Sequence, residues 1–301
     1  MNAPSGSSDS GGAFPRPQSR HAAGLTLVSV LVVVLLGLAP ANATWSIVGV
    51  DREAGEVGVA IASCVPGVLL GDLDEPLEPV VLVPGVGAGV SQAALNGDAP
   101  PEIRRLLADG ASAEAVLAAI TSPSFDGRSA DRQHAVVTLA GSGAGFTGQS
   151  NQSVALDRSA DLGWVQGNIL VSEAVVDDAV IAFETSGGDL ATKLVAALQA
   201  GAEAGGDSRC GEQTALFAHV VVADREDAAD APSVLLSVSV VEGDGDNPVT
   251  MLVDAFEAGE RRWVSGPTFI EEFGPSFAVL GLGVFLLVGL GAAIRARRRA
   301  A

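Results

Sequence analysis

The sequence contains no tyrosine, and aromatic residues make up only 4% of its 301 positions. A buried core must therefore come mainly from aliphatic side chains, and hydrophobic residues do supply 48% of the chain. Positive charge is also scarce, with 17 Lys and Arg against 36 Asp and Glu, for a formal net charge of −19. A nucleic-acid partner is not expected, because few side chains could neutralise phosphates. The acidic balance is explained most simply by solubility.

Sulfur is nearly absent, with Cys64 and Cys210 as the only cysteines. Neither belongs to a CxxC pair or a Cys/His cluster, so no metal site is predicted. In an oxidising compartment the two could form one disulfide. Two separate buried thiols are the alternative, since the sequence does not show how close their Cα atoms lie. The glycine-rich segment 141–145 lacks the Lys-Ser/Thr of a phosphate-binding loop, and no cofactor is expected.

The first 43 residues have the pattern of a secretory signal peptide behind a polar leader. Two arginines precede an apolar run over 25–38, and Ala41-Asn42-Ala43 forms an A-x-A cleavage site. Cleavage after Ala43 would leave Thr44 as the first residue of the mature chain. An uncleaved N-terminal anchor is the alternative interpretation.

A second apolar run, Phe277 to Ile294, is followed by four arginines within 295–301. A run of this length can just span a bilayer, and the arginines should stay on the cytoplasmic side. The pattern predicts a linker over 265–275, a transmembrane helix over 276–294 and a basic tail over 295–301. Together with the signal peptide, it indicates a single-pass type I protein of the cell membrane whose domain, 44–264, lies outside the cytoplasm. A sorting signal that is later removed is the alternative.

Between these segments the hydrophobic period alternates between that of strands and that of helices. Ser112 is expected to cap a helix. Strands in hairpins and helices in pairs favour an α+β layered sandwich over a doubly wound sheet. Strands are expected over 44–50, 57–63, 80–83, 87–92, 133–140, 145–148, 216–223 and 234–241, and helices within 100–120, 175–184, 188–204 and 248–258.

A collinear series of short motifs carries a resemblance to a known family. The string T-W-S-I-V-G-V-D-x-x-x-G-E-V-G-V-A-I-A-S begins at Thr44. Further motifs include G-V-G-A at 85–88, S-Q-A at 91–93, D-R-Q at 131–133, V-Q-G-N-I-L at 165–170 and G-G-D-S-R at 205–209. From Thr44 to about Ala258 the chain resembles the DUF1028 family, which is grouped with the N-terminal-nucleophile (Ntn) hydrolases. The resemblance implies their four-layer αββα sandwich but no known substrate.

An N-terminal threonine carries both a nucleophile and a base. Its Oγ can attack a carbonyl while its α-amine, which titrates near pH ~8, accepts the proton. Thr44 is therefore the candidate nucleophile. The other candidate catalytic residues are Asn168, Gln166, Ser63 and Gln92, and Asp207 and Arg209 are candidates for orienting the amine or a substrate carboxylate.

The sequence thus predicts an exported, membrane-tethered amide-bond hydrolase of the Ntn type that acts on a small amide or peptide. The expected partners are that substrate and the membrane, reached through Phe277 to Ile294, and a homo-oligomer is compatible with the sequence. The alternative is a binding or structural module that keeps the fold without the chemistry.

Overall fold

The computed structural model describes residues 44–71, 73, 75–141 and 143–266, which form a mixed α+β fold with two sheets and five α-helices. The predicted signal peptide, transmembrane helix and basic tail lie outside these residues. Within the described part of the chain, every helix is too short or too polar to cross a bilayer.

The larger sheet has seven strands in the order β11-β10-β9-β2-β1-β8-β7. All neighbours pair antiparallel except β10 and β11, which are parallel. The strands are β1 (Thr44–Asp51), β2 (Glu56–Ser63), β7 (Leu156–Ala160), β8 (Gly163–Asn168), β9 (Phe217–Ala223), β10 (Val234–Ser239) and β11 (Arg262–Ser265). Because β1 lies inside this sheet, both of its edges are paired.

The smaller sheet has four antiparallel strands in the order β3-β4-β5-β6. They are β3 (Val80–Val83), β4 (Gly87–Ala93), β5 (Arg132–Thr138) and β6 (Gly143–Thr147). The strands β3 and β4, joined through Pro84-Gly85, form one hairpin, and β5 and β6 form a second.

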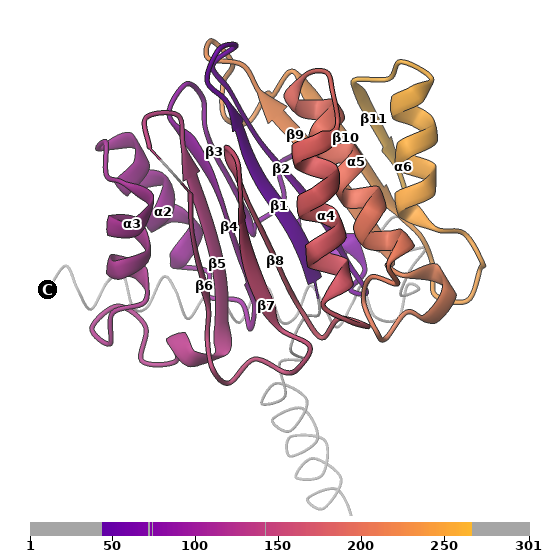
Figure 1. Ribbon diagram of the computed structural model, residues 1–301, viewed down its shortest axis with the longest axis horizontal. Helices are drawn as coiled ribbons and strands as arrows, with labels where there is room; N and C mark the ends of the chain where they lie inside the picture. The colour runs from indigo at the N-terminus through magenta and orange to yellow at the C-terminus, as the bar shows by residue number, and fades with distance from the viewer. Residues whose placement is uncertain (1–43, 72, 74, 142, 267–301) are drawn as a thin grey trace, which may run out of the picture. The chain divides into compact units, whose positions relative to one another are not determined.

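Five α-helices cover the outer faces of the two sheets (Figure 1). The small sheet carries α2 (Ala99–Ala108) and α3 (Ala113–Ile120), and the large sheet carries α4 (Ala174–Thr185), α5 (Leu190–Glu203) and α6 (Pro248–Glu257). Side chains cap three of the helices: Ser112 accepts from the Ala115 amide, Asp189 from the Thr192 amide, and Asn247 from the amides of Val249 and Thr250. Such caps satisfy amides at the start of a helix, and each stabilises its helix by about 1 kcal/mol.

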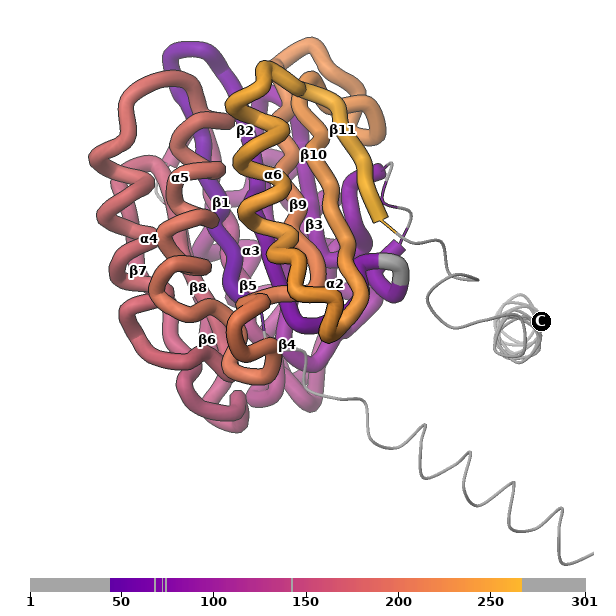
Figure 2. Tube along the Cα trace, turned by 90° about the vertical axis from the view of Figure 1, so that its right-hand side faces the viewer, coloured from indigo at the N-terminus to yellow at the C-terminus, as the bar shows by residue number. Residues whose placement is uncertain are grey.

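The elements stack as helices, sheet, sheet and helices, and Figure 2 shows α4, α5 and α6 side by side over the large sheet. Three apolar clusters fill the spaces between these layers. The cluster between the sheets is built almost wholly from Val, Leu, Ile and Ala, with Phe217 as its one fully buried aromatic residue among those described. This agrees with the aliphatic core expected from the composition.

Most of the predicted elements are confirmed, and three strands are additional. The hairpin that begins at Thr44, the helices within 100–120 and the Ser112 cap are present. The strands β7, β8 and β11 were not expected. The interior of β8 holds glycine, glutamine and asparagine, and β7 is a charged edge strand, so neither has the apolar alternation typical of a strand.

Two histidines on interior strands are buried in the core. His134 lies on β5 opposite Ser91, and His219 lies on β9 opposite Ser237. The nitrogens of both rings lack hydrogen-bond partners among the described residues. Burial lowers the pKa of His219 to about 3. Burial first and the nearby Arg132 second lower the pKa of His134 to about 4, against an opposing effect of Asp126.

These two histidines should make the fold sensitive to mild acid. Between pH ~6.5, where an unfolded histidine titrates, and pH ~4, the unfolded chain binds protons that the folded chain does not. The free energy of unfolding should therefore fall by about 1.4 kcal/mol per pH unit for each histidine as the pH decreases. Urea denaturation between pH 7 and pH 4 would measure this slope.

The variants His134→Gln and His219→Gln should each reduce the pH dependence of the free energy of unfolding by about 1.4 kcal/mol per pH unit, the contribution of one histidine. The double variant should lose both contributions. An unchanged slope in the double variant would show that other groups cause the acid sensitivity.

Candidate active site

The first strand presents its alternate residues to two different layers. Trp45 and Ile47 pack in the cluster beneath the outer helices, and Val48 and Val50 pack in the cluster between the sheets. Because side chains alternate along a strand, Thr44 also faces the space between the sheets, as does Ser46. Thr44 is 3% exposed and Ser46 is fully buried. The interior layer thus becomes polar where β1 begins.

The strands beside β1 add further polar groups at the same level. Thr44 pairs with Ser63 on β2 and with Asn168 on β8, and Ser46 pairs with Gln166 on β8. All of these side chains are on the face of the large sheet that looks toward the small sheet. The register therefore brings together four of the predicted site residues, Thr44, Ser63, Gln166 and Asn168.

The small sheet contributes Gln92 from β4, directly across from Thr44 and Ser46. Its Nε2 donates to the Thr44 carbonyl oxygen at 3.2 Å, and its Oε1 accepts from the Ser46 hydroxyl at 2.7 Å. Gln166 Nε2 lies 3.4 Å from the same hydroxyl, on the other side. Gln92 therefore links the two sheets at the start of β1.

Gln133 on β5 holds Gln92 in place. Its Oε1 accepts from Gln92 Nε2 at 2.8 Å, and its own Nε2 lies 2.9 Å from the Thr147 hydroxyl and 2.9 Å from the Gly167 carbonyl oxygen. Gln133 is fully buried. A buried amide with partners on several strands fixes the spacing of the two sheets, because each lost partner would leave a polar atom unsatisfied.

Two residues beside this cluster have unusual backbone conformations. Ala93, directly after Gln92, has φ 68°, and Ile169, directly after Asn168, has φ 55°. A positive φ is unfavourable for residues with a Cβ, most of all for a β-branched one, and such strain tends to collect at functional sites. Gln166 Oε1 is also buried without a partner among the described residues. This end of the interior layer therefore combines a strained backbone with an unsatisfied polar atom.

A separate segment occupies the position beyond the amino end of β1. Asp207 forms a bridge with Leu170, and the Ser208 amide donates to the Ile169 carbonyl oxygen at 3.1 Å. Next to Asp207, Gly206 has φ +57°, and a Cβ there would lie 2.7 Å from the Thr214 carbonyl oxygen. The segment therefore pairs with the chain that follows β8, just beyond Asn168, which is the residue of β8 that pairs with Thr44.

Asp207 and Arg209 form a fixed ion pair at the edge of the polar cluster. The fully buried Asp207 carboxylate accepts from Arg209 Nε at 3.1 Å and Nη2 at 2.8 Å, and from the Cys64 amide at 2.8 Å. The Arg209 side chain is 32% exposed. Cys64 directly follows Ser63, the partner of Thr44, so this carboxylate lies between the ends of β2 and β8, which flank β1.

A disulfide between Cys64 and Cys210 ties the same segment to β2, with Cα atoms 5.7 Å apart. It resolves the alternative left open by the sequence in favour of a bond. The bond spans 146 residues of sequence, and closing a loop of that size stabilises a fold by on the order of 5 kcal/mol in the chain-entropy treatment. The disulfide therefore fixes the loop that carries Asp207 and Arg209.

The structure thus places all seven predicted site residues at one end of the sandwich. Ser46 and Gln133, which belong to the same network, were not predicted. Ser46 could have been found from the alternation of β1, because it shares a face with Thr44. Gln133 has no such local signal, since its importance rests on partners far along the chain.

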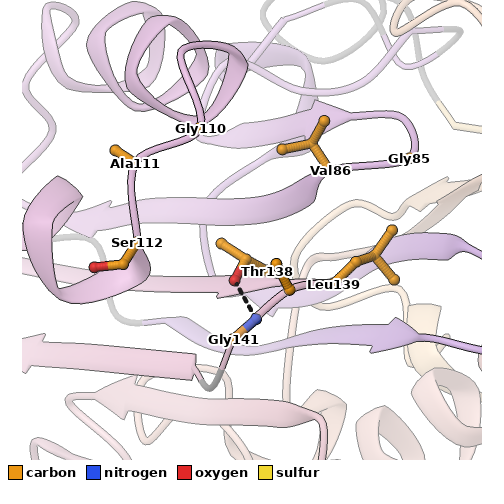
Figure 3. Close-up of a pocket in the computed structure, with 9 residues that line it drawn as sticks. Gly85, Val86, Gly110, Ala111, Ser112, Thr138, Leu139 and Gly141 are labelled. Atoms are coloured by element: carbon orange, nitrogen blue, oxygen red, sulfur yellow. Dashed lines mark hydrogen bonds between the residues drawn. The ribbon is translucent and has the colours of Figure 1, made fainter.

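Two cavities of the domain are not lined by Thr44 or by the polar side chains beside it. Figure 3 shows one of about 280 Å³, lined by Gly85, Val86, Thr138 and the turn before α3, where the Gly141 amide donates to the Thr138 hydroxyl at 3.0 Å. It lies at the opposite ends of β4 and β5. Another, of about 410 Å³, lies between α5 and α6. Within the described ranges, no three His, Cys, Asp or Glu side chains are grouped as metal ligands.

The role of Gln133 can be tested through stability. Gln133→Leu would leave the Gly167 and Leu156 carbonyl oxygens and Gln92 Nε2 without their buried partner, and it should lower the free energy of unfolding by about 2–3 kcal/mol. Gln199→Leu is a matched control, because Gln199 bonds only to Glu203 on the surface of α5 among the described contacts; it should change stability by less than about 0.5 kcal/mol. Equal effects in urea denaturation would contradict a special role for Gln133.

Comparison with known proteins places the chain in a family. The crystal structure of protein SPO2555 from Silicibacter pomeroyi, a DUF1028 protein, is similar, with a TM-score of 0.59 and 27% sequence identity over 77% of this chain and 94% of that one. No curated protein is similar enough to count as a match. The model of the family of unknown function DUF1028 matches residues 44–252, which begin at the first residue of β1. The chain therefore belongs to the DUF1028 family.

Proposed function

We propose that this protein is an exported, membrane-tethered amide-bond hydrolase of the Ntn type, with Thr44 as its nucleophile. One coincidence carries the proposal: the residue that follows the A-x-A motif is also the first residue of an inner strand, facing a buried polar cluster. Cleavage after Ala43 would convert the Thr44 amide nitrogen into an α-amine at that point. The layering of helices, sheet, sheet and helices is compatible with an Ntn hydrolase.

The chemistry follows from the two groups of an N-terminal threonine. Thr44 Oγ attacks the carbonyl carbon of an amide while the α-amine accepts the hydroxyl proton. The α-amine returns that proton to the leaving nitrogen as the C–N bond breaks, and an ester on Thr44 remains. Water then attacks the ester, its proton passes to Thr44 Oγ through the α-amine, and the carboxylic acid product leaves.

The residues beside Thr44 fit supporting roles in this reaction. The side-chain amide of Asn168, the partner of Thr44 on β8, is the best-placed candidate to donate to the oxyanion. Gln92 donates to the Thr44 carbonyl oxygen, Ser46 donates to Gln92, and Gln166 donates to Ser46. Ser63 flanks Thr44 on the other strand. These contacts would position the nucleophile, which must be held within a fraction of an ångström to react efficiently.

Asp207 is the candidate for orienting the α-amine, since its carboxylate lies beyond the amino end of β1. A charged α-ammonium would be attracted to that carboxylate, and Arg209 would balance the buried negative charge. Arg209, one-third exposed, could in turn orient a substrate carboxylate.

The proposal predicts covalent labelling of Thr44. A β-lactone that acylates N-terminal threonines should label the processed protein, with labelling that rises through pH ~8 as the α-amine loses its proton. Thr44→Ala should lose the label and Thr44→Ser should retain it, as judged by intact mass. Thr185→Ala is a matched control on the surface of α4 and should label like the native protein.

The same experiment separates this function from a non-catalytic module on the same fold. Thr44→Ala is expected to keep the native melting curve, because only a small side chain is removed. Equal labelling of the native protein and folded Thr44→Ala would contradict a nucleophilic role and favour the binding module.

A further inference from the structure

Exposed apolar side chains are concentrated at the end of the sandwich that carries Thr44. Among the residues that the structure describes, five large apolar side chains are exposed: Leu69, Leu95, Val171, Ile181 and Val241. Four of them follow strands that end beside the polar cluster, and we call these four the apolar rim. They are Leu69 in the 3-10 turn Gly67–Leu69 after β2, Leu95 after β4, Val171 after β8 and Val241 after β10.

The strand register shows that these four strands end side by side with the start of β1. Ser63 at the end of β2 and Asn168 at the end of β8 both pair with Thr44. Ser63 also pairs with Phe217, which pairs with Ser239 at the end of β10. Gln92, near the end of β4, bonds to the Thr44 carbonyl oxygen. The rim residues therefore come from four separate loops around one end of the domain, whereas Ile181 lies on α4.

The described chain also enters and leaves at this end. It begins at Thr44, and its last residue, Gly266, lies against Ser239, which is on the same level as Thr44. The apolar run that starts at Phe277 begins eleven residues after Gly266 in the sequence. An extended linker of that length reaches at most about 40 Å. If this run spans the membrane as proposed, the bilayer lies within that reach of Gly266.

We propose that the apolar rim rests on the surface of the lipid bilayer, so that the end of the domain that carries Thr44 faces the membrane. Exposed apolar side chains gathered at one end of a domain can mark such a contact surface, and the proposed membrane span would keep this end at the bilayer. Three acidic residues are exposed next to Val241: Glu242, Asp244 and Asp246. Because their carboxylates repel anionic head groups, we expect the rim to prefer a zwitterionic bilayer over an anionic one.

This placement also indicates a substrate class: amphiphilic amides, such as N-acylated amines, that reach the site from the lipid surface. The substrate class rests on the proposed function of Thr44, whereas the lipid contact rests on the proposed membrane tether alone.

Photocrosslinking in the full-length protein tests the contact. A benzophenone amino acid replaces Leu69, Leu95, Val171 or Val241 in turn, and Ile181 serves as the matched control because it is at least as exposed, at 58%. Each variant is reconstituted in phosphatidylcholine vesicles, checked for an unchanged melting curve and irradiated. Mass spectrometry should find several-fold more lipid adducts at the rim positions than at position 181.

Adduct yields at the four rim positions no higher than at position 181 would overturn the proposal. Replacing half of the lipid with phosphatidylglycerol should lower the rim adducts, and a rise would contradict the assigned lipid preference. β-Lactone labelling of the same samples separates the two proposals: adducts without Thr44 labelling refute catalysis alone, and labelling without rim adducts refutes the lipid contact alone.

Discussion

The site depends on the pairing of β1 along both of its edges. With β2 on one side and β8 on the other, β1 cannot shift by one residue without exchanging Thr44 and Ser46 for Trp45 and Ile47. Such a slip would bury a tryptophan between the sheets and turn hydroxyls toward the outer helices. The large aliphatic surfaces on both faces of the strand therefore fix the direction of the Thr44 side chain, although they take no part in any chemistry.

Three groups of the polar cluster satisfy one another across the two sheets. Gln133, Gln92 and Ser46 form a directed series of hydrogen bonds in an environment where an unsatisfied amide is costly. On the other side of Thr44, a disulfide and a buried ion pair hold the segment that carries Asp207. Thr44 thus lies between two rigid supports, which suits a residue that must be held in one orientation.

Local patterns in the sequence were sufficient to predict most elements but not the complete site. Alternation identified β1 and β2, and the Ser112 cap was recognisable from its position alone. The strand β8 was missed, because its glycines and amides are atypical of a strand interior. Gln133 was missed because its partners lie 14 to 41 residues away along the chain. The disulfide joins cysteines 146 residues apart, a proximity that composition and spacing do not reveal.

The account depends most on where the mature chain begins, because only a free amine at Thr44 can act as the base for its own hydroxyl. The direct measurement is N-terminal sequencing, together with the intact mass, of the protein isolated from the membranes of cells that produce it. We predict a chain that starts at Thr44 and lacks residues 1–43. A mature chain that starts at any other residue would contradict the threonine mechanism.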